Sequence, residues 1–189
     1  MAKGKLKYAT IICIVVGFIL LIVGYIKSDS LYYDNLLKSN NLSNPSQVFN
    51  WTTQNFSTPK SLYVHPNLSP RYLIEKHKSL WCDEGAIVMA TLDNKLGYKT
   101  RLVDLYGYDN IAHHTILQVI EKGQWVNYDF TFRLSNQPLV KSSDSFHMKL
   151  KKGRIKTYPK LYNYLINNNY FIKRIVFALR GIKEEDPVR

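Results

Sequence analysis

The chain contains little cysteine: only Cys13 and Cys82 occur in its 189 residues. Cys13 lies in an apolar N-terminal segment, so the remainder holds a single thiol and cannot form an internal disulfide. Zinc binding is not indicated either. Cys82 does not complete a ligand set with His113 and His114, because adjacent residues of a strand point to opposite faces. We therefore expect no metal site and no cofactor.

Glycine and acidic residues are also scarce. The nine glycines form no loop that could cradle a phosphate. The 14 acidic residues are outnumbered by 26 basic ones, which gives a net charge of +12. Residues 141–189 carry twelve basic and four acidic side chains (net +8), whereas residues 31–140 carry ten and nine (net +1). The basic C-terminal region favours contact with an anionic lipid or an acidic polymer.

A long apolar run follows a short basic N-terminus. Three lysines precede residues 8–26, which are uncharged and almost wholly apolar. As a helix this run would span about 28 Å, close to the hydrocarbon thickness of a bilayer. We expect an uncleaved signal-anchor, since no Ala-x-Ala-like site follows Ile26; a cleaved signal peptide is the alternative. The lysines predict a single-pass membrane protein with a cytoplasmic N-terminus and an extracytoplasmic domain, which makes nucleic acid the least favoured partner.

The most informative pattern is a cysteine followed by a histidine and an aspartate. Cys82 lies 32 residues before His114, and His114 lies 15 residues before Asp129. A thiol attacks as a thiolate, usually with an imidazole beside it, and the imidazole needs a carboxylate or amide that fixes its tautomer. These three residues could supply all the parts of a covalent acyl-transfer site.

Other residues surround the three in a definite order. A small residue, a glycine and an arginine follow the cysteine, at Ala86, Gly97 and Arg101. After the histidine come Gln118-Val119, and Trp125 lies four residues before the aspartate. From Cys82 to about Arg133, some 52 residues, this order resembles the transglutaminase-like branch of the papain-like cysteine enzymes, in a bacterial membrane-anchored form.

The resemblance implies an α+β fold with a papain-like core, in which the cysteine-bearing helix packs on an antiparallel sheet. It also implies that Cys82 is the nucleophile, that His114 is the general acid and base, and that Asp129 orients the imidazole. The sequence departs from the family at three positions. Leu80 stands where a glycine is frequent, Ile116 where an aromatic residue is usual, and Gln118 where the family has glutamate.

The periodicity predicts the local elements. We expect helices at 31–39, 70–78 and 82–96, with Gly97 ending the last, and strands at 101–105, 115–120 and 125–130. A hairpin turn at 121–124, centred near residue 122, would pair position 114 with about 130, within a residue of Asp129. Residues 149–154 are expected to form a basic loop, and 159–167 and 170–180 to form helices.

Three parts of the chain follow from this interpretation. Residues 1–29 form the basic N-terminus and the anchor, residues 30–140 form the transglutaminase-like domain with its core at 78–133, and residues 141–189 form a basic, largely helical extension. Residues 40–69 are interpreted as a segment that wraps the domain.

Several neighbours of the triad have open roles. Trp81 could line the substrate cleft or pack beneath the site, and His113 is the rival of His114. Trp125 is expected in the core. Arg101 is either a surface strand residue or the partner of a carboxylate such as Asp83. Asp83 and Glu84 suit the first turn of a helix, where carboxylates favour the dipole.

Two functions compete on these grounds. The first is a membrane-anchored cysteine acyl-transfer enzyme acting on a peptide, protein or amide substrate, with hydrolysis favoured over cross-linking because an external aqueous site admits water. The second is a catalytically inactive papain-like binding or assembly module at the membrane, which the departures at Leu80, Ile116 and Gln118 keep open.

Overall fold

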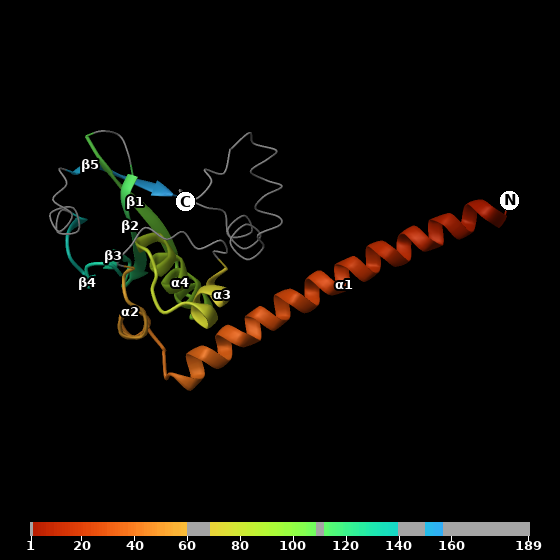
Figure 1. Ribbon diagram of the computed structural model, residues 1–189, viewed down its shortest axis with the longest axis horizontal. Coiled ribbons are helices and arrows are strands. Elements are labelled where there is room, and N and C mark those ends of the chain that lie inside the picture. The colour runs from red at the N-terminus through yellow and green to blue at the C-terminus, as the bar shows by residue number, and fades with distance from the viewer. Residues whose placement is uncertain (1, 60–68, 109–111, 140–149, 157–189) are drawn as a thin grey trace. The chain divides into compact units, whose positions relative to one another are not determined.

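A computed structural model of the chain describes residues 2–59, 69–108, 112–139 and 150–156 (Figure 1). The chain divides into two compact units, Met1–Asn41 and Leu42–Arg189. The first unit holds α1 (Ala2–Ser39), a single continuous helix. The separate helix expected at 31–39 is therefore the end of a longer one. The helices predicted at 159–167 and 170–180 lie outside the described residues.

The anchor predicted at about 8–26 falls within α1. Most side chains of α1 before Lys27 are outside the described part of the structure. Among the residues that are described, no helix has the length and apolar character needed to cross a bilayer. The anchor stays a prediction.

Three helices belong to the second unit: α2 (Pro45–Asn55), α3 (Pro70–Lys76) and α4 (Cys82–Lys95). The α2 helix was missed by the sequence analysis, which placed only a covering segment there. Its start is well defined, because the Asn44 side chain accepts a hydrogen bond from the Gln47 N–H and Pro45 occupies the first turn. The predictions for α3 and α4 are confirmed, and Gly97 follows α4 with a φ of 90°.

The strands form one antiparallel sheet in the order β4-β3-β2-β1-β5. Their bounds are Thr100–Gly107 for β1, Ala112–Glu121 for β2, Gln124–Asp129 for β3, Leu134–Ser135 for β4 and Leu150–Lys156 for β5. The loop predicted at 149–154 is wrong, because β5 pairs with β1 along this stretch. A sequence rich in lysine carries no apolar alternation, and the pairing with β1 supplies the backbone hydrogen bonds that make it a strand.

A tight two-residue turn connects β2 and β3. Lys122 and Gly123 both have positive φ, 50° and 81°, and Glu121 pairs with Gln124. The register therefore differs by one residue from the predicted one; its last pair is Leu117 with Tyr128, and continuing it by one step would place Asp129 opposite Ile116. Since residues two apart on a strand share a face, this register puts His114 and Asp129 on the same face of the sheet, whereas the predicted register would have put them on opposite faces.

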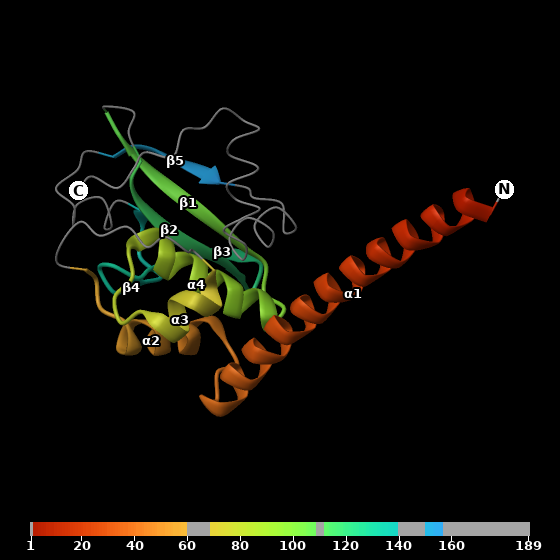
Figure 2. The ribbon, with the colours of Figure 1, turned by 45° about the vertical axis from the view of Figure 1, so that its right-hand side comes forward.

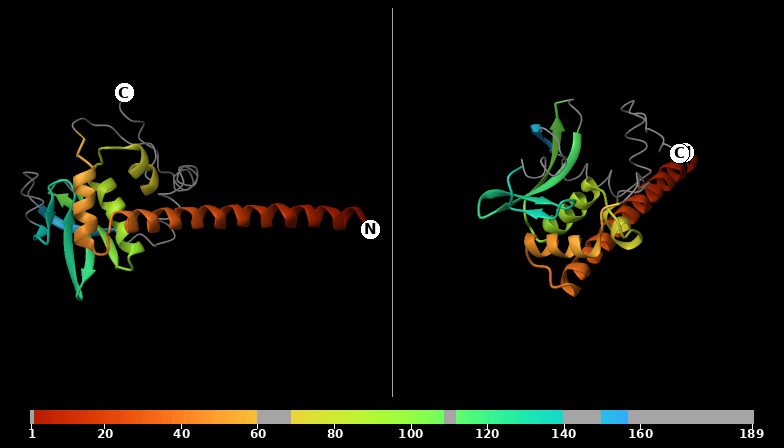
Figure 3. Two further views of the ribbon diagram at one scale, coloured as in Figure 1. Left: turned by 90° about the horizontal axis from the view of Figure 1, so that it is seen from below. Right: turned by 60° about the vertical axis from the view of Figure 1, so that its left-hand side comes forward.

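The helices α2, α3 and α4 lie on one side of the sheet (Figures 2 and 3). The α4 helix contacts β1, β2 and β3, while α2 and α3 pack on α4. The core is formed by buried apolar side chains of α4 and the sheet, among them Ala86, Val88, Met89, Leu92, Leu102, Leu117 and Val119. The predicted α+β class, with a helix on an antiparallel sheet, is confirmed.

Candidate active site

Cys82 is the first residue of α4, and the residues just before it form backbone hydrogen bonds with a segment outside the helix. The Leu80 N–H donates to the Ser57 carbonyl at 2.9 Å, and the Ser57 N–H donates to the Lys78 carbonyl at 3.0 Å. Leu80 itself is fully buried. Leu80 therefore belongs to the core, and its backbone hydrogen bond helps to place the start of α4.

The first turn of α4 is closed by Glu84. Its carboxylate accepts the Trp81 N–H at 2.8 Å, and the Trp81 carbonyl accepts the first helical hydrogen bond from Gly85 at 2.8 Å. Glu84 is buried, and this burial raises its pKa to about 7, opposed by the hydrogen bond from Trp81 and reinforced by the charge of Asp83. Glu84 thus stabilises the turn that carries Cys82 by a direct cap as well as through the helix dipole.

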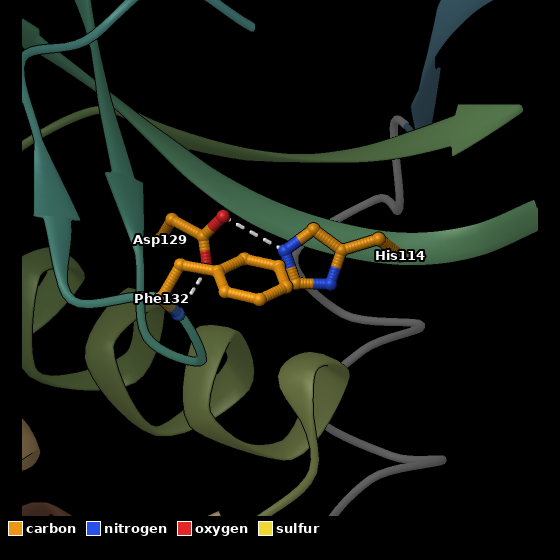
Figure 4. Close-up of polar contacts among 3 residues, drawn as sticks. All are labelled: His114, Asp129 and Phe132. Carbon is orange, nitrogen blue, oxygen red and sulfur yellow. Dashed lines mark hydrogen bonds and ion pairs between the residues drawn. The ribbon is translucent and has the colours of Figure 1, made fainter. Parts of the chain in front are cut away.

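His114 and Asp129 form a buried pair (Figure 4). His114 Nε2 donates a hydrogen bond to Asp129 Oδ2 at 2.8 Å, and each residue is only 1% exposed. The other carboxylate oxygen, Oδ1, accepts the Phe132 N–H at 3.2 Å. Both oxygens of Asp129 are therefore oriented, which fixes the direction of the imidazole. The predicted proximity of His114 and Asp129 is confirmed.

Cys82 interacts with the same imidazole. Burial lowers the pKa of His114, but hydrogen bonds to Asp129 and Cys82, together with the charges of these two partners, raise it to about 9. Because Nε2 faces Asp129, Nδ1 is the ring nitrogen left for the sulfur, and Figure 4 shows it directed away from the carboxylate. The fold thus brings together three residues from α4, β2 and β3, and Cys82 is only half-buried.

Phe132 completes the surroundings of the histidine. Its ring meets the imidazole edge-on, with the centroids 5.3 Å apart. Phe132 follows Asp129 by three residues in a tight turn, so one short segment supplies both the carboxylate and the ring that covers the imidazole. Phe132 was not predicted as a site residue. The sequence offered one signal for its role, namely an aromatic residue three positions after the aspartate.

The other predicted site residues have different surroundings. Trp81 is half-buried beside Cys82, whereas His113 is exposed on the strand face opposite His114.

Arg101 does not pair with Asp83. Its Nε donates a hydrogen bond to Gln118, and its guanidinium stacks on Trp125. Trp125 was expected in the core but is only half-buried, and its ring stacks on this arginine. Within the described ranges no three His, Cys, Asp or Glu side chains could hold a metal.

Ile116 belongs to a small apolar cluster of the sheet. It is fully buried with Val103 and Leu105, and Leu139 packs against the cluster. An aliphatic side chain therefore fills this place in the sheet.

No protein-family model matches the chain, and no curated protein matches its sequence. A likeness to transglutaminase-like enzymes therefore rests on the residues of the site alone.

Proposed function

We propose that the chain is a membrane-anchored, transglutaminase-like cysteine enzyme that hydrolyses amide or peptide bonds. The observation that carries the proposal is the buried hydrogen bond of 2.8 Å between His114 and Asp129, with Cys82 near enough to the same imidazole to help raise its pKa. A cysteine, a histidine and a carboxylate in this order can activate a thiol, hold an imidazole in one tautomer and transfer a proton.

The first half of the reaction forms a thioester. The Cys82 thiolate attacks the carbonyl carbon of the scissile amide, and the carbonyl π electrons move to oxygen. His114, which is protonated on both ring nitrogens, then gives its Nδ1 proton to the leaving nitrogen as the C–N bond breaks. Asp129 keeps Nε2–H directed at its own carboxylate throughout, so only Nδ1 exchanges protons with the reacting groups.

The oxyanion requires hydrogen-bond donors near the sulfur. Cys82 stands in the first turn of α4, where backbone N–H groups have no acceptor within the helix. The Trp81 side chain cannot cap this turn, because an indole donates but does not accept hydrogen bonds. The Cys82 N–H is therefore suited to meet the oxyanion, with the positive end of the helix dipole adding to its effect.

The second half consumes water. The neutral imidazole takes a proton from water at Nδ1, hydroxide attacks the thioester carbon, and the C–S bond breaks to release a carboxylic acid and the thiolate. An amine in place of water would give a transferred acyl group. We favour water because the anchor at about 8–26 would place the domain in an extracytoplasmic, aqueous compartment. The basic region at 141–189 would contact an anionic lipid or acidic polymer there.

The test compares variants of the full-length chain in detergent. Alkylation of Cys82 by iodoacetamide is followed by mass spectrometry across a range of pH. The wild type should react at neutral pH, and His114→Ala should slow this reaction about tenfold or more, since the imidazole no longer stabilises the thiolate. His113→Ala, which changes the adjacent exposed histidine, is the matched control and should react like the wild type.

Turnover is then measured on a peptide mixture in water labelled with heavy oxygen. Cys82→Ser and His114→Ala should abolish release of labelled carboxylic acids, whereas Cys13→Ser should not. Equal alkylation in the wild type and His114→Ala would overturn the proposal and favour an inactive binding or assembly module. Incorporation of an added primary amine without incorporation of label would show acyl transfer in place of hydrolysis.

A further inference from the structure

Arg101 of β1 is held in one orientation by two contacts. Its Nε donates a hydrogen bond of 2.6 Å to Oε1 of Gln118 on β2, and its Cζ lies 3.8 Å from the centre of the Trp125 ring on β3. The first contact fixes the direction of the guanidinium and the second fixes its plane. Arg101 and Trp125 are both half-buried, so the pair keeps surface in contact with solvent.

A relay of amides determines which atom Gln118 presents to the arginine. Gln118 Nε2 donates to Asn127 Oδ1 at 2.6 Å, and Asn127 Nδ2 donates to the carbonyl of Gln137 at 2.6 Å. Because each amide nitrogen is used by the next acceptor, the oxygen of Gln118 is the atom that remains for Arg101. The guanidinium therefore loses little further freedom when it binds a ligand.

The charge of Arg101 is not balanced by its neighbours. Gln118 is neutral. Within the described ranges, no carboxylate lies within ion-pair distance of Arg101, and Nε is the one guanidinium nitrogen that donates a hydrogen bond. A guanidinium has five N–H donors, so the two amino groups retain theirs. Burial lowers the pKa of Arg101, because water solvates its charge less well than in a free side chain.

We propose that Arg101, stacked on Trp125, binds a carboxylate group of a ligand at this face of the sheet. The planar fork of the two amino groups matches the two oxygens of a carboxylate, and one guanidinium balances one negative charge. A phosphate dianion would call for a second cation. This site is separate from Cys82, His114 and Asp129, and its occupation does not depend on their chemistry.

The experiment uses the full-length chain in detergent and the indole N–H resonance of Trp125, assigned with Trp125→Phe. N-acetylglycine serves as the carboxylate probe and N-acetylglycinamide as its uncharged match. The carboxylate should shift the resonance in a saturable way and the amide should not. Arg101→Gln should weaken binding about tenfold or more, and Arg101→Lys, which keeps the charge without the fork, should also weaken it.

The variant Gln118→Glu tests most directly whether the unbalanced charge of Arg101 is needed for binding. This change places a carboxylate of the protein itself against the guanidinium, so it should weaken binding of N-acetylglycine about tenfold; it also removes the hydrogen bond that Gln118 donates to Asn127. Unchanged binding in this variant would overturn the proposal, as would equal binding of the amide. Inorganic phosphate should bind more weakly than N-acetylglycine, and tighter binding of phosphate would overturn the assignment to carboxylates.

Discussion

Gly85 packs directly against the side chain of Phe130, leaving no room between them for a methyl group. A β-carbon built on Gly85 would overlap the ring of Phe130 and its Cβ atom. Gly85 lies one turn after Cys82 in α4, and Phe130 directly follows Asp129. The contact therefore sets the separation between the helix that carries the thiol and the strand end that carries the carboxylate.

We predict that Gly85→Ala destabilises the protein, although alanine is the better helix former by about 1 kcal/mol. The added methyl group would force α4 away from Phe130, and overpacking of this kind costs about 1 to 3 kcal/mol. Thermal denaturation should show the loss, and alkylation of Cys82 should lose part of its dependence on His114.

Gly24→Ala is the matched control, because it makes the same change in a helix where the new methyl group meets open space. It should leave the melting temperature unchanged or slightly raised. A Gly85→Ala protein as stable as the wild type would show that the helix and the strand end can separate without cost.

Asp129→Asn should lower the pKa of His114 well below its value of about 9 and reduce turnover about a thousandfold. The amide keeps an oxygen for the Phe132 N–H, but it removes the negative charge that stabilises the imidazolium. An NMR titration of the His114 ring measures the pKa, and an unchanged value would contradict the assigned pair.

The same pair predicts a pH dependence of stability. Because the pKa of His114 rises from 6.5 to about 9 on folding, its contribution is complete below pH 6.5 and is lost as the pH rises through about 9. Chemical denaturation at a series of pH values should show this loss in the wild type. In Asp129→Asn the decline should be much smaller.

Phe132→Ala should uncover the hydrogen bond between His114 and Asp129. Without the ring, water reaches the imidazole and competes for Asp129, so turnover should fall about tenfold. In the wild type the shielded Nε2–H proton should give a resolved low-field NMR signal, and in the variant this signal should broaden by exchange with water. Phe132→Leu, which still covers the imidazole, should retain most of the signal. Persistence of the signal in Phe132→Ala would exclude a shielding role.

Asp93→Asn should stabilise the protein near pH 7 by about 1 to 3 kcal/mol. Burial, with the nearby charge of Glu121, raises the pKa of Asp93 to about 8, and its Oδ1 has no hydrogen-bond partner among the described residues. A carboxyl whose pKa rises on folding makes stability fall as the pH rises from about 4 to about 8. The neutral amide removes this fall.

Chemical denaturation provides the check, with its own control at low pH. At pH 4 the Asp93 carboxyl is already protonated in the folded state, so the wild type and Asp93→Asn should be about equally stable there. A constant difference in stability at every pH would show that packing, and not ionisation, distinguishes the two proteins.

Local sequence determined the elements closest to the site. The α4 helix begins at Cys82 and stops before Gly97 as predicted, because apolar spacing and a glycine at the end are local signals. The hairpin between β2 and β3 follows from Lys122-Gly123 for the same reason. Since a strand has a period of two, the shift of one residue in register is what brings His114 and Asp129, 15 residues apart, to one face of the sheet.

Contacts between segments far apart in the chain determined the features that the sequence did not predict. The strand β5 forms only because β1 offers an edge, and Leu80 is placed by the backbone of Ser57. Trp125 was predicted in the core but lies under Arg101, since the antiparallel register brings them together across β2. Nothing local to Gly85 indicates that Phe130 packs against it. The sequence by itself determined which chemical groups the protein has and their spacing along helix and strand, whereas tertiary packing decided which are buried, shielded or paired, because burial and pairing depend on partners far away in the chain.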